Sequence, residues 1–168
     1  MATKKSMWVL FSILLISAWV LGSAIQVGAE TMKCKNIATA TKDERISVSD
    51  EEGHVLGLQI MDGLAFCESG EIAKVRHHAV FDQSRKGTQA IGYTILTFED
   101  GSTIVSRFQR LVSGTGSATA TTELIKGTGR FEGIKGTASA TGKNFPPRKE
   151  EAARAFNDVT LTYTLPTK

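Results

Sequence analysis

The sequence predicts an all-β protein, a single eight-stranded antiparallel barrel behind an N-terminal signal segment. Short segments that alternate apolar and polar residues are separated by turn residues, which is the pattern of half-buried strands. One turn, Asp100-Gly101, lies between two β-branched runs and is a strong hairpin signal. No strand-like segment alternates with a long amphipathic helix, which argues against a parallel α/β sheet. Strands joined by hairpins favour a meander closed into a barrel, with a sandwich as the alternative.

The first element, Met1–Ala29, has the layout of a targeting segment. Lys4 and Lys5 precede an uncharged run that reaches Ile25, and small residues end the segment at Ala29. We therefore expect cleavage after Ala29, with the barrel domain over residues 30–168. The apolar run nearly spans a bilayer, so an uncleaved anchor is the alternative. Both interpretations place the rest of the chain across the membrane, which predicts an exported protein, periplasmic or secreted.

Cys34 and Cys67 are the two cysteines of the chain. In an oxidising compartment an even pair is typical of a disulfide, and two buried free thiols are the alternative. Their spacing with the three histidines matches no zinc pattern, so we expect no metal.

Eight further segments carry the strand pattern: 44–49, 54–67, 72–82, 91–98, 103–112, 117–126, 137–141 and 157–165. Gly57 and Gly63 interrupt the second of them and indicate a bend or a bulge. Lys149–Ala155 has a composition that suits one or two helical turns.

The segment Gly127–Gly136 reads Gly-Thr-Gly-Arg-Phe-Glu-Gly-Ile-Lys-Gly. This resembles the glycine-rich turn of the allene oxide cyclase and dirigent barrel superfamily. The stretch Tyr93–Arg107 and the terminal Leu-Thr-Tyr-Thr-Leu-Pro are similar in style to its small bacterial members. The resemblance implies a calycin-like eight-stranded barrel with a central cavity. It also implies that the turn is structural and that Phe131 closes the barrel base.

Charge and composition exclude several functions. Without Met1–Ala29 the chain has 139 residues, 18 Lys+Arg against 17 Asp+Glu, and no tryptophan. A near-neutral chain with few aromatic residues argues against nucleic-acid and carbohydrate binding.

The glycine runs 127–133 and 136–143 miss the spacing of a dinucleotide fingerprint and a P-loop, so no cofactor is expected. No serine or cysteine nucleophile has a histidine base beside it.

His77 is the first candidate for a ligand-binding residue, because it shares a predicted apolar face with Val75, Ala79 and Phe81. Its alternative role is a core histidine that is hydrogen-bonded to a neighbour. His78 points to the opposite face, so the two histidines do not act as a pair.

The other candidate ligand-binding residues are Tyr93, Arg107, Gln109 and Glu123. Tyr93, Arg107 and Gln109 share the parity of apolar neighbours, which predicts either a polar cluster inside the barrel or exposed outer residues. Glu123 is either an inward acid or an exposed carboxylate.

The leading hypothesis is a binding barrel whose cavity accepts a small, mainly apolar ligand outside the cytoplasm. The alternative is an isomerase or cyclase of the allene oxide cyclase type, which would need His77, Arg107 or Glu123 inside the barrel; no catalytic residue is matched. A homo-oligomer formed through an exposed strand face is a further expectation. Membrane contact is expected only through an uncleaved N-terminal segment.

Overall fold

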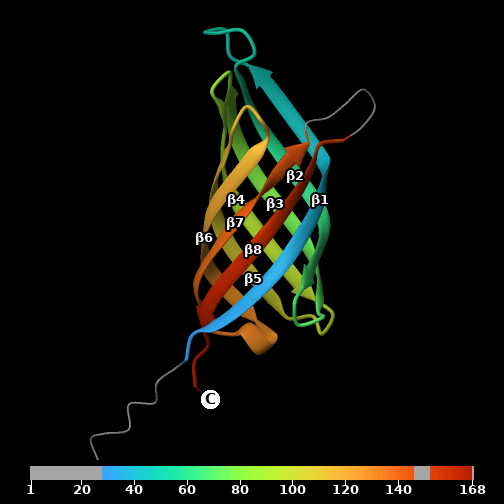
Figure 1. Cartoon of the computed structure of the whole chain (residues 1–168), viewed down its shortest axis with the longest axis vertical. Helices are drawn as coiled ribbons and strands as arrows, with labels where there is room; N and C mark the ends of the chain where they lie inside the picture. The colour runs from blue at the N-terminus through green and yellow to red at the C-terminus, as the bar shows by residue number, and fades with distance from the viewer. Residues whose placement is uncertain (1–27, 146–151, 168) are drawn as a thin grey trace, which may run out of the picture.

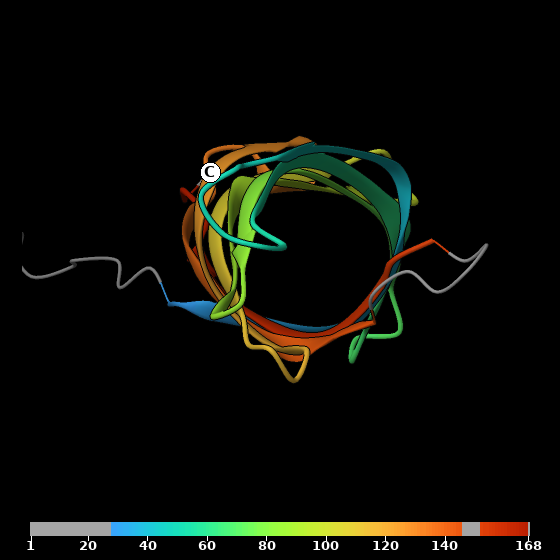
Figure 2. The same cartoon turned by 90° about the horizontal axis from the view of Figure 1, so that it is seen from above.

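The computed structural model describes residues 28–145 and 152–167. Eight strands pair in chain order, each antiparallel to the next, and the last pairs with the first to close a barrel (Figure 1). The strands are β1 (Glu30–Ser47), β2 (Val55–Cys67), β3 (Ile72–Ser84), β4 (Gly87–Phe98), β5 (Thr103–Val112), β6 (Ser117–Thr128), β7 (Lys135–Phe145) and β8 (Arg154–Thr164). Figure 2 shows the closed ring of strands from above. The predicted fold class is therefore confirmed.

β1 begins well before the predicted segment 44–49. Its first half buries Met32, Cys34 and Ala38 on one face, but polar Asn36 lies on this face and apolar Ile37 on the exposed one, which breaks the alternation. A bulge follows, because the register with β2 shifts between Ala40 and Lys42. The bulge that we expected from the glycines of β2 thus lies in the strand opposite it.

Gly57 has a different role from the one predicted. A Cβ on this residue would lie 2.2 Å from the ring of Phe81, the residue directly opposite on β3. Glycine at this position therefore lets a large inward ring occupy the space beside β2.

The helical turn predicted for Lys149–Ala155 is wrong where the structure describes it. Arg154 and Ala155 belong to β8 and pair with Phe145 and Asn144 of β7, while residues 149–151 lie outside the described part of the chain. The predicted targeting segment also lies outside it, except for Gly28 and Ala29. In residues 28–145 and 152–167, no helix has the length and apolar character needed to cross a membrane.

The β6–β7 turn lies at the lower end of the barrel in the orientation of Figure 1. Packed side chains close this end. The turn between β6 and β7 forms the short 3-10 helix η1 (Gly129–Phe131), whose Phe131 is only 3% exposed. The Phe131 ring lies 4.9 Å from that of Phe98 and 6.2 Å from that of Tyr163, measured between ring centroids. Gly129 and Gly133 have φ values of 63° and 77°, which glycine adopts without strain. Phe131 thus closes the base, as the resemblance implied.

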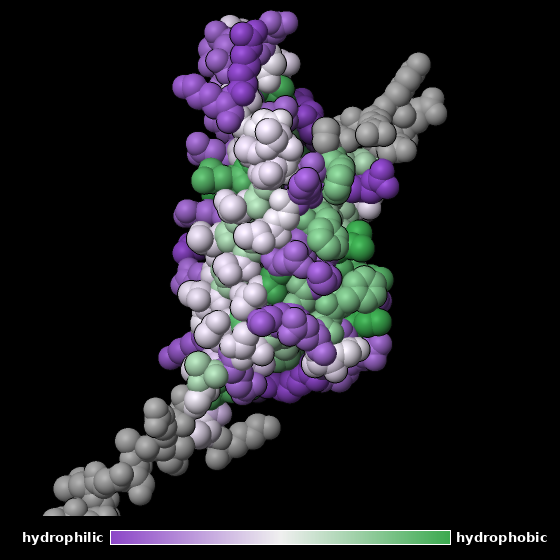
Figure 3. Space-filling model, viewed as in Figure 1, coloured by the Kyte–Doolittle hydropathy of each residue, from purple (hydrophilic) through white to green (hydrophobic). Residues whose placement is uncertain are grey.

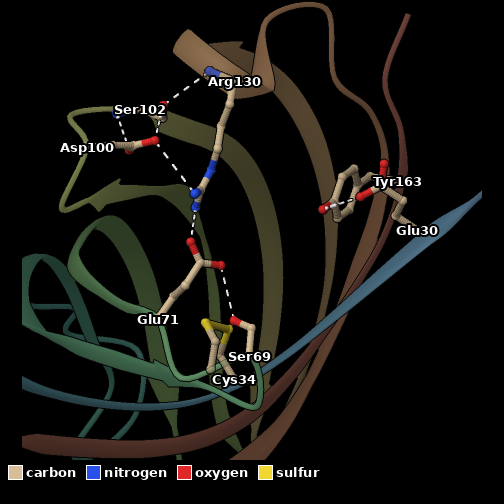
Figure 4. Close-up of polar contacts among 9 residues, drawn as sticks. Glu30, Cys34, Ser69, Glu71, Asp100, Ser102, Arg130 and Tyr163 are labelled. Carbon is tan, nitrogen blue, oxygen red and sulfur yellow. Dashed lines mark hydrogen bonds and ion pairs between the residues drawn. A yellow bond between two sulfur atoms is a disulfide. The ribbon is translucent and has the colours of Figure 1, made fainter. Parts of the chain in front are cut away.

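Arg130 ties η1 to two neighbouring turns (Figure 4). Its guanidinium forms an ion pair with Glu71 and lies 3.6 Å from Asp100, and it stacks on the rings of Phe98 and Phe131. Its backbone N–H donates to Ser102 Oγ, and that hydroxyl donates in turn to Asp100. All of these contacts lie within the closed end, so the cluster around Arg130 stabilises the fold there.

A disulfide joins Cys34 of β1 to Cys67 of β2 at directly opposite positions, so the predicted bridge is confirmed. Both residues belong to the same buried cluster as Phe131 and Tyr163. The bridge therefore reinforces the closed end of the barrel.

Candidate functional site

A cavity of about 540 Å³ occupies the upper part of the barrel and is lined by residues of all eight strands. Its floor consists of apolar residues that border the packed lower core, namely Leu96, Ile104, Leu124 and Leu161. Its mouth is bordered by the β3–β4 and β5–β6 turns, including Ser84, Gly87 and the residues 113–116. The volume lies in the range of small-molecule sites.

The cavity exists because one wall carries small side chains. Ala120 and Thr122 of β6 and Ala138 and Ala140 of β7 face it, whereas larger residues line the opposite strands β2 and β3. In an eight-stranded barrel, side chains from all strands are needed to fill the interior. Alanine on two adjacent strands leaves that space unfilled.

His77 of β3 faces the cavity, as the predicted alternation required. Its Nδ1 lies 2.8 Å from Thr94 Oγ1, and its ring meets that of Phe108 edge-on at 6.1 Å. Burial is the main cause that lowers the pKa of His77 to about 4, and the nearby charge of Arg110 adds to it. The imidazole is therefore neutral at physiological pH.

Arg110 of β5 is the central cation of the cavity wall. Its Nη2 donates to Asn144 Oδ1 at 2.6 Å and to Asn157 Oδ1 at 3.0 Å, so it reaches from β5 to β7 and β8. Burial lowers the pKa of Arg110, but an arginine stays protonated at neutral pH. The site thus holds a permanent positive charge.

Three enclosed polar atoms of the lining have no hydrogen-bond partner in the described part of the chain: Asn36 Oδ1, His77 Nε2 and Arg110 Nε. Buried polar atoms are normally satisfied by protein, water or ligand. Their presence in one cavity indicates a site where hydrogen-bonding atoms remain available to a ligand.

A second polar group lies beside the upper part of the cavity. Arg45 binds Asp43 at 2.9 Å and donates to Gln83 at 3.1 Å, and Gln59 donates to the same carboxylate. Burial raises the pKa of Asp43, but hydrogen bonds from Arg45 and Gln59 outweigh it, so the pKa is lowered overall. The charge of Arg45 is therefore matched by an acid.

No protein-family model matches this chain, and no curated protein matches it. Among solved structures, the pterocarpan synthase dirigent protein PsPTS1 is similar, with a TM-score of 0.50 and 13% identity over 83% of this chain and 97% of that one. The pterocarpan synthase dirigent protein GePTS1 gives a TM-score of 0.49 and 11% identity, over 82% and 92%. The fold is dirigent-like. At 13% identity the likeness shows the barrel fold alone.

The dirigent-like barrel places the other four predicted residues on its outer face, which corrects the expectation of an inward polar cluster. Tyr93 is 47% exposed, and Gln109 is also exposed. Arg107 pairs with Glu123 at 2.8 Å across the outside of β5 and β6, with both side chains about 60% exposed. None of the four lines the cavity.

The error comes from β4 and β5, which carry apolar residues on both faces. Ile91 and Leu111 are exposed on the outside, while Leu96 and Phe108 are buried inside, so apolar parity did not identify the interior. Arg110 lines the cavity but was not among the predicted ligand-binding residues, because the apolar neighbour Leu111 faces outward and suggested the wrong inner face. A signal was available on its own strand, because Arg110 shares the parity of Ile104 and Phe108, which are both buried.

Apolar side chains also occur on the outer face of the barrel. Ile37 of β1 and Leu64 and Phe66 of β2 are each at least 42% exposed, and Ile37 lies directly opposite Leu64. Figure 3 shows apolar groups gathered on the side where β1 and β2 lie. The homo-oligomer expected from an exposed strand face remains a prediction.

Proposed function

We propose that this barrel binds a small, mainly apolar molecule in its cavity. The observation that carries the proposal is the unfilled interior, whose floor and much of whose wall are apolar while a few polar groups converge on it. Preformed apolar pockets with a small number of placed polar groups are the usual form of small-molecule sites. We further propose that the protein acts outside the cytoplasm, with which the Cys34–Cys67 disulfide is compatible.

The alternative, an isomerase or cyclase, has less support. Of the three ionisable groups that it would use, His77 borders the cavity, while Arg107 and Glu123 lie outside. A histidine whose pKa is lowered to about 4 is a weak general base at neutral pH. Binding without chemistry is therefore the better proposal.

A titration with the uncharged dye phenylnaphthylamine tests the binding proposal, because its fluorescence rises in apolar sites. We expect saturable binding to the oxidised protein with one dye per chain. The double variant Ala120→Leu and Ala140→Leu adds bulk to the cavity wall and should weaken binding at least roughly tenfold. Each substitution adds three carbon atoms to the cavity, and the loss of about two buried methylene contacts already weakens binding by a factor of about ten.

The matched control acts on the outside. Leu58→Thr with Ile91→Thr removes apolar side chains from the exposed faces of β2 and β4. If this variant loses the dye and the alanine variant keeps it, the dye binds the outer surface and the proposal is wrong.

A further inference from the structure

Arg110 is a cation in a cavity whose described lining holds no acid. The lining residues include Arg45, Arg110 and Arg154, but none of those described is Asp or Glu. Asp43 matches the charge of Arg45. In the described part of the chain, the Arg110 guanidinium donates to neutral amide oxygens, those of Asn144 and Asn157. Its positive charge therefore lacks an ionic partner there.

The surroundings of Arg110 keep the space beside it open. Ala90 of β4 and Ala120 of β6 lie directly opposite it on the two flanking strands, and Ala140 follows on β7. Residues directly opposite have Cβ atoms only about 5 Å apart, so larger residues here would occupy the open space beside the guanidinium. The row of alanines instead leaves this side chain at the border of the cavity.

The buried charge has an energetic consequence. Transfer of a cation from water into the protein is unfavourable, and an opposite charge nearby offsets that cost. Burial alone lowers the pKa of Arg110, with no acid acting in the other direction. Among described residues, Glu123 and Asp158 lie on strands that the side chain approaches, but both are exposed and engaged outside the barrel with Arg107 and Lys35. An anion inside the cavity would supply the missing charge.

We propose that the ligand of this cavity is an apolar molecule with one anionic group, and that the guanidinium of Arg110 recognises that group. The inference rests on the proposed function and narrows it to amphipathic acids. Carboxylates, sulfonates and phosphate monoesters share the chemistry that a guanidinium recognises. Asn144 and Asn157 act as positioning residues, because they hold Nη2 from β7 and β8.

Two matched dyes test the proposal. Anilinonaphthalenesulfonate carries the same aromatic body as phenylnaphthylamine plus one sulfonate. We expect the charged dye to bind the wild-type protein roughly tenfold more tightly or better, because a charge-assisted contact strengthens binding by about that factor. Naphthoate and naphthyl phosphate as competitors, each compared with naphthamide, then show whether carboxylate or phosphate is preferred.

The decisive variant is Arg110→Gln, with Arg107→Gln as the control on the same strand but on the outer face. Arg110→Gln should remove the preference for the charged dye and keep the affinity for the neutral one, which also shows that the barrel is folded. Arg107→Gln should leave both affinities unchanged, and Arg110→Lys should retain part of the preference.

The outcomes separate the two proposals. Equal affinity of the wild type for both dyes, or a preference that survives in Arg110→Gln, overturns the anion site while the neutral dye still supports an apolar cavity. Failure of both dyes to bind the wild type overturns the cavity as a ligand site. If Arg110→Gln does not fold, the other two variants decide. The anion site is supported if Arg110→Lys still prefers the charged dye, and it is overturned if Arg107→Gln loses that preference.

Discussion

At the lower end of the barrel packed apolar side chains fill the inward positions, whereas at the upper end the same strands also carry alanine, threonine, asparagine and arginine around an open space. The lower cluster joins Val75, Phe98, Phe131 and Tyr163 around the disulfide. The upper half surrounds a cavity with His77 and Arg110 on its wall. Both halves share one hydrogen-bonded sheet, so they differ in the side chains that point into the barrel.

The comparison separates stability from binding. Burial of apolar area stabilises the lower end, and its polar groups are used in contacts such as that of the Tyr163 hydroxyl with Glu30. Burial raises the pKa of Tyr163 to about 12, and the Glu30 carboxylate adds to this. At the upper end, the three enclosed polar atoms without described partners leave interactions open to a ligand. We therefore expect mutations at the two ends to change different properties.

The largest effect is expected for Phe131→Ala, which opens the closed base. Truncation of a buried phenylalanine costs about 3–5 kcal/mol of unfolding free energy, because a cavity remains in a close-packed core. Phe108→Ala, on the cavity wall, should cost less, since its ring already borders empty space on one side. Urea unfolding followed by circular dichroism measures both. An equal or larger loss for Phe108→Ala would contradict the difference between the two ends.

The double variant Cys34→Ala and Cys67→Ala should lose about 3–4 kcal/mol, because the bridge closes a loop with a sequence separation of 33. The same loss should follow reduction of the wild type with dithiothreitol, which should leave the variant unchanged. Unfolding midpoints with and without reductant provide the measurement. Unchanged stability in the reduced wild type would show that the lower end does not depend on the bridge.

His77 should make stability depend on pH. Its folded pKa is about 4, below the ordinary value of 6.5, so the unfolded chain binds the extra proton between these values. The contribution is complete above about pH 6.5 and falls as the pH is lowered toward 4, by at most ~3 kcal/mol.

The variant His77→Gln isolates this dependence, because other groups titrate in both proteins. As the pH falls from about 6.5 toward 4, the unfolding free energy of the wild type should fall relative to that of the variant. Parallel curves would place His77 in a hydrated environment rather than an enclosed one.

The smallest effect is expected from a pair of matched enlargements. Ala65→Leu, at a position with no exposure in the lower core, should cost about 1–3 kcal/mol through overpacking. Ala120→Leu enters the cavity and should change stability by less than about 1 kcal/mol, because the new side chain meets open space. Thermal unfolding of the two variants compares them directly. A larger loss for Ala120→Leu would show that the upper interior is already filled.

Much of the fold followed from local patterns. The hairpin at Asp100-Gly101 lies between β4 and β5, and β5 has the predicted bounds. The first half of β1 was missed because buried Asn36 breaks its apolar alternation. Of the predicted ligand-binding residues, only His77 lines the cavity, because β3 is the strand whose two faces differ clearly in composition.

The sequence alone determined that the chain alternates as strands and turns at its glycines, since these features depend on neighbours in the chain. The closure of the base by Phe131 was implied only by the family resemblance, because it consists of contacts with the distant Phe98 and Tyr163. Which face of β4 and β5 points inward was decided only by the closed sheet, because both faces are apolar. Barrel closure also set Arg110 beside Asn144 and Asn157, which lie 34 and 47 residues away along the chain. The cavity itself is a property of eight strands together, because a void arises only where opposing side chains fail to meet.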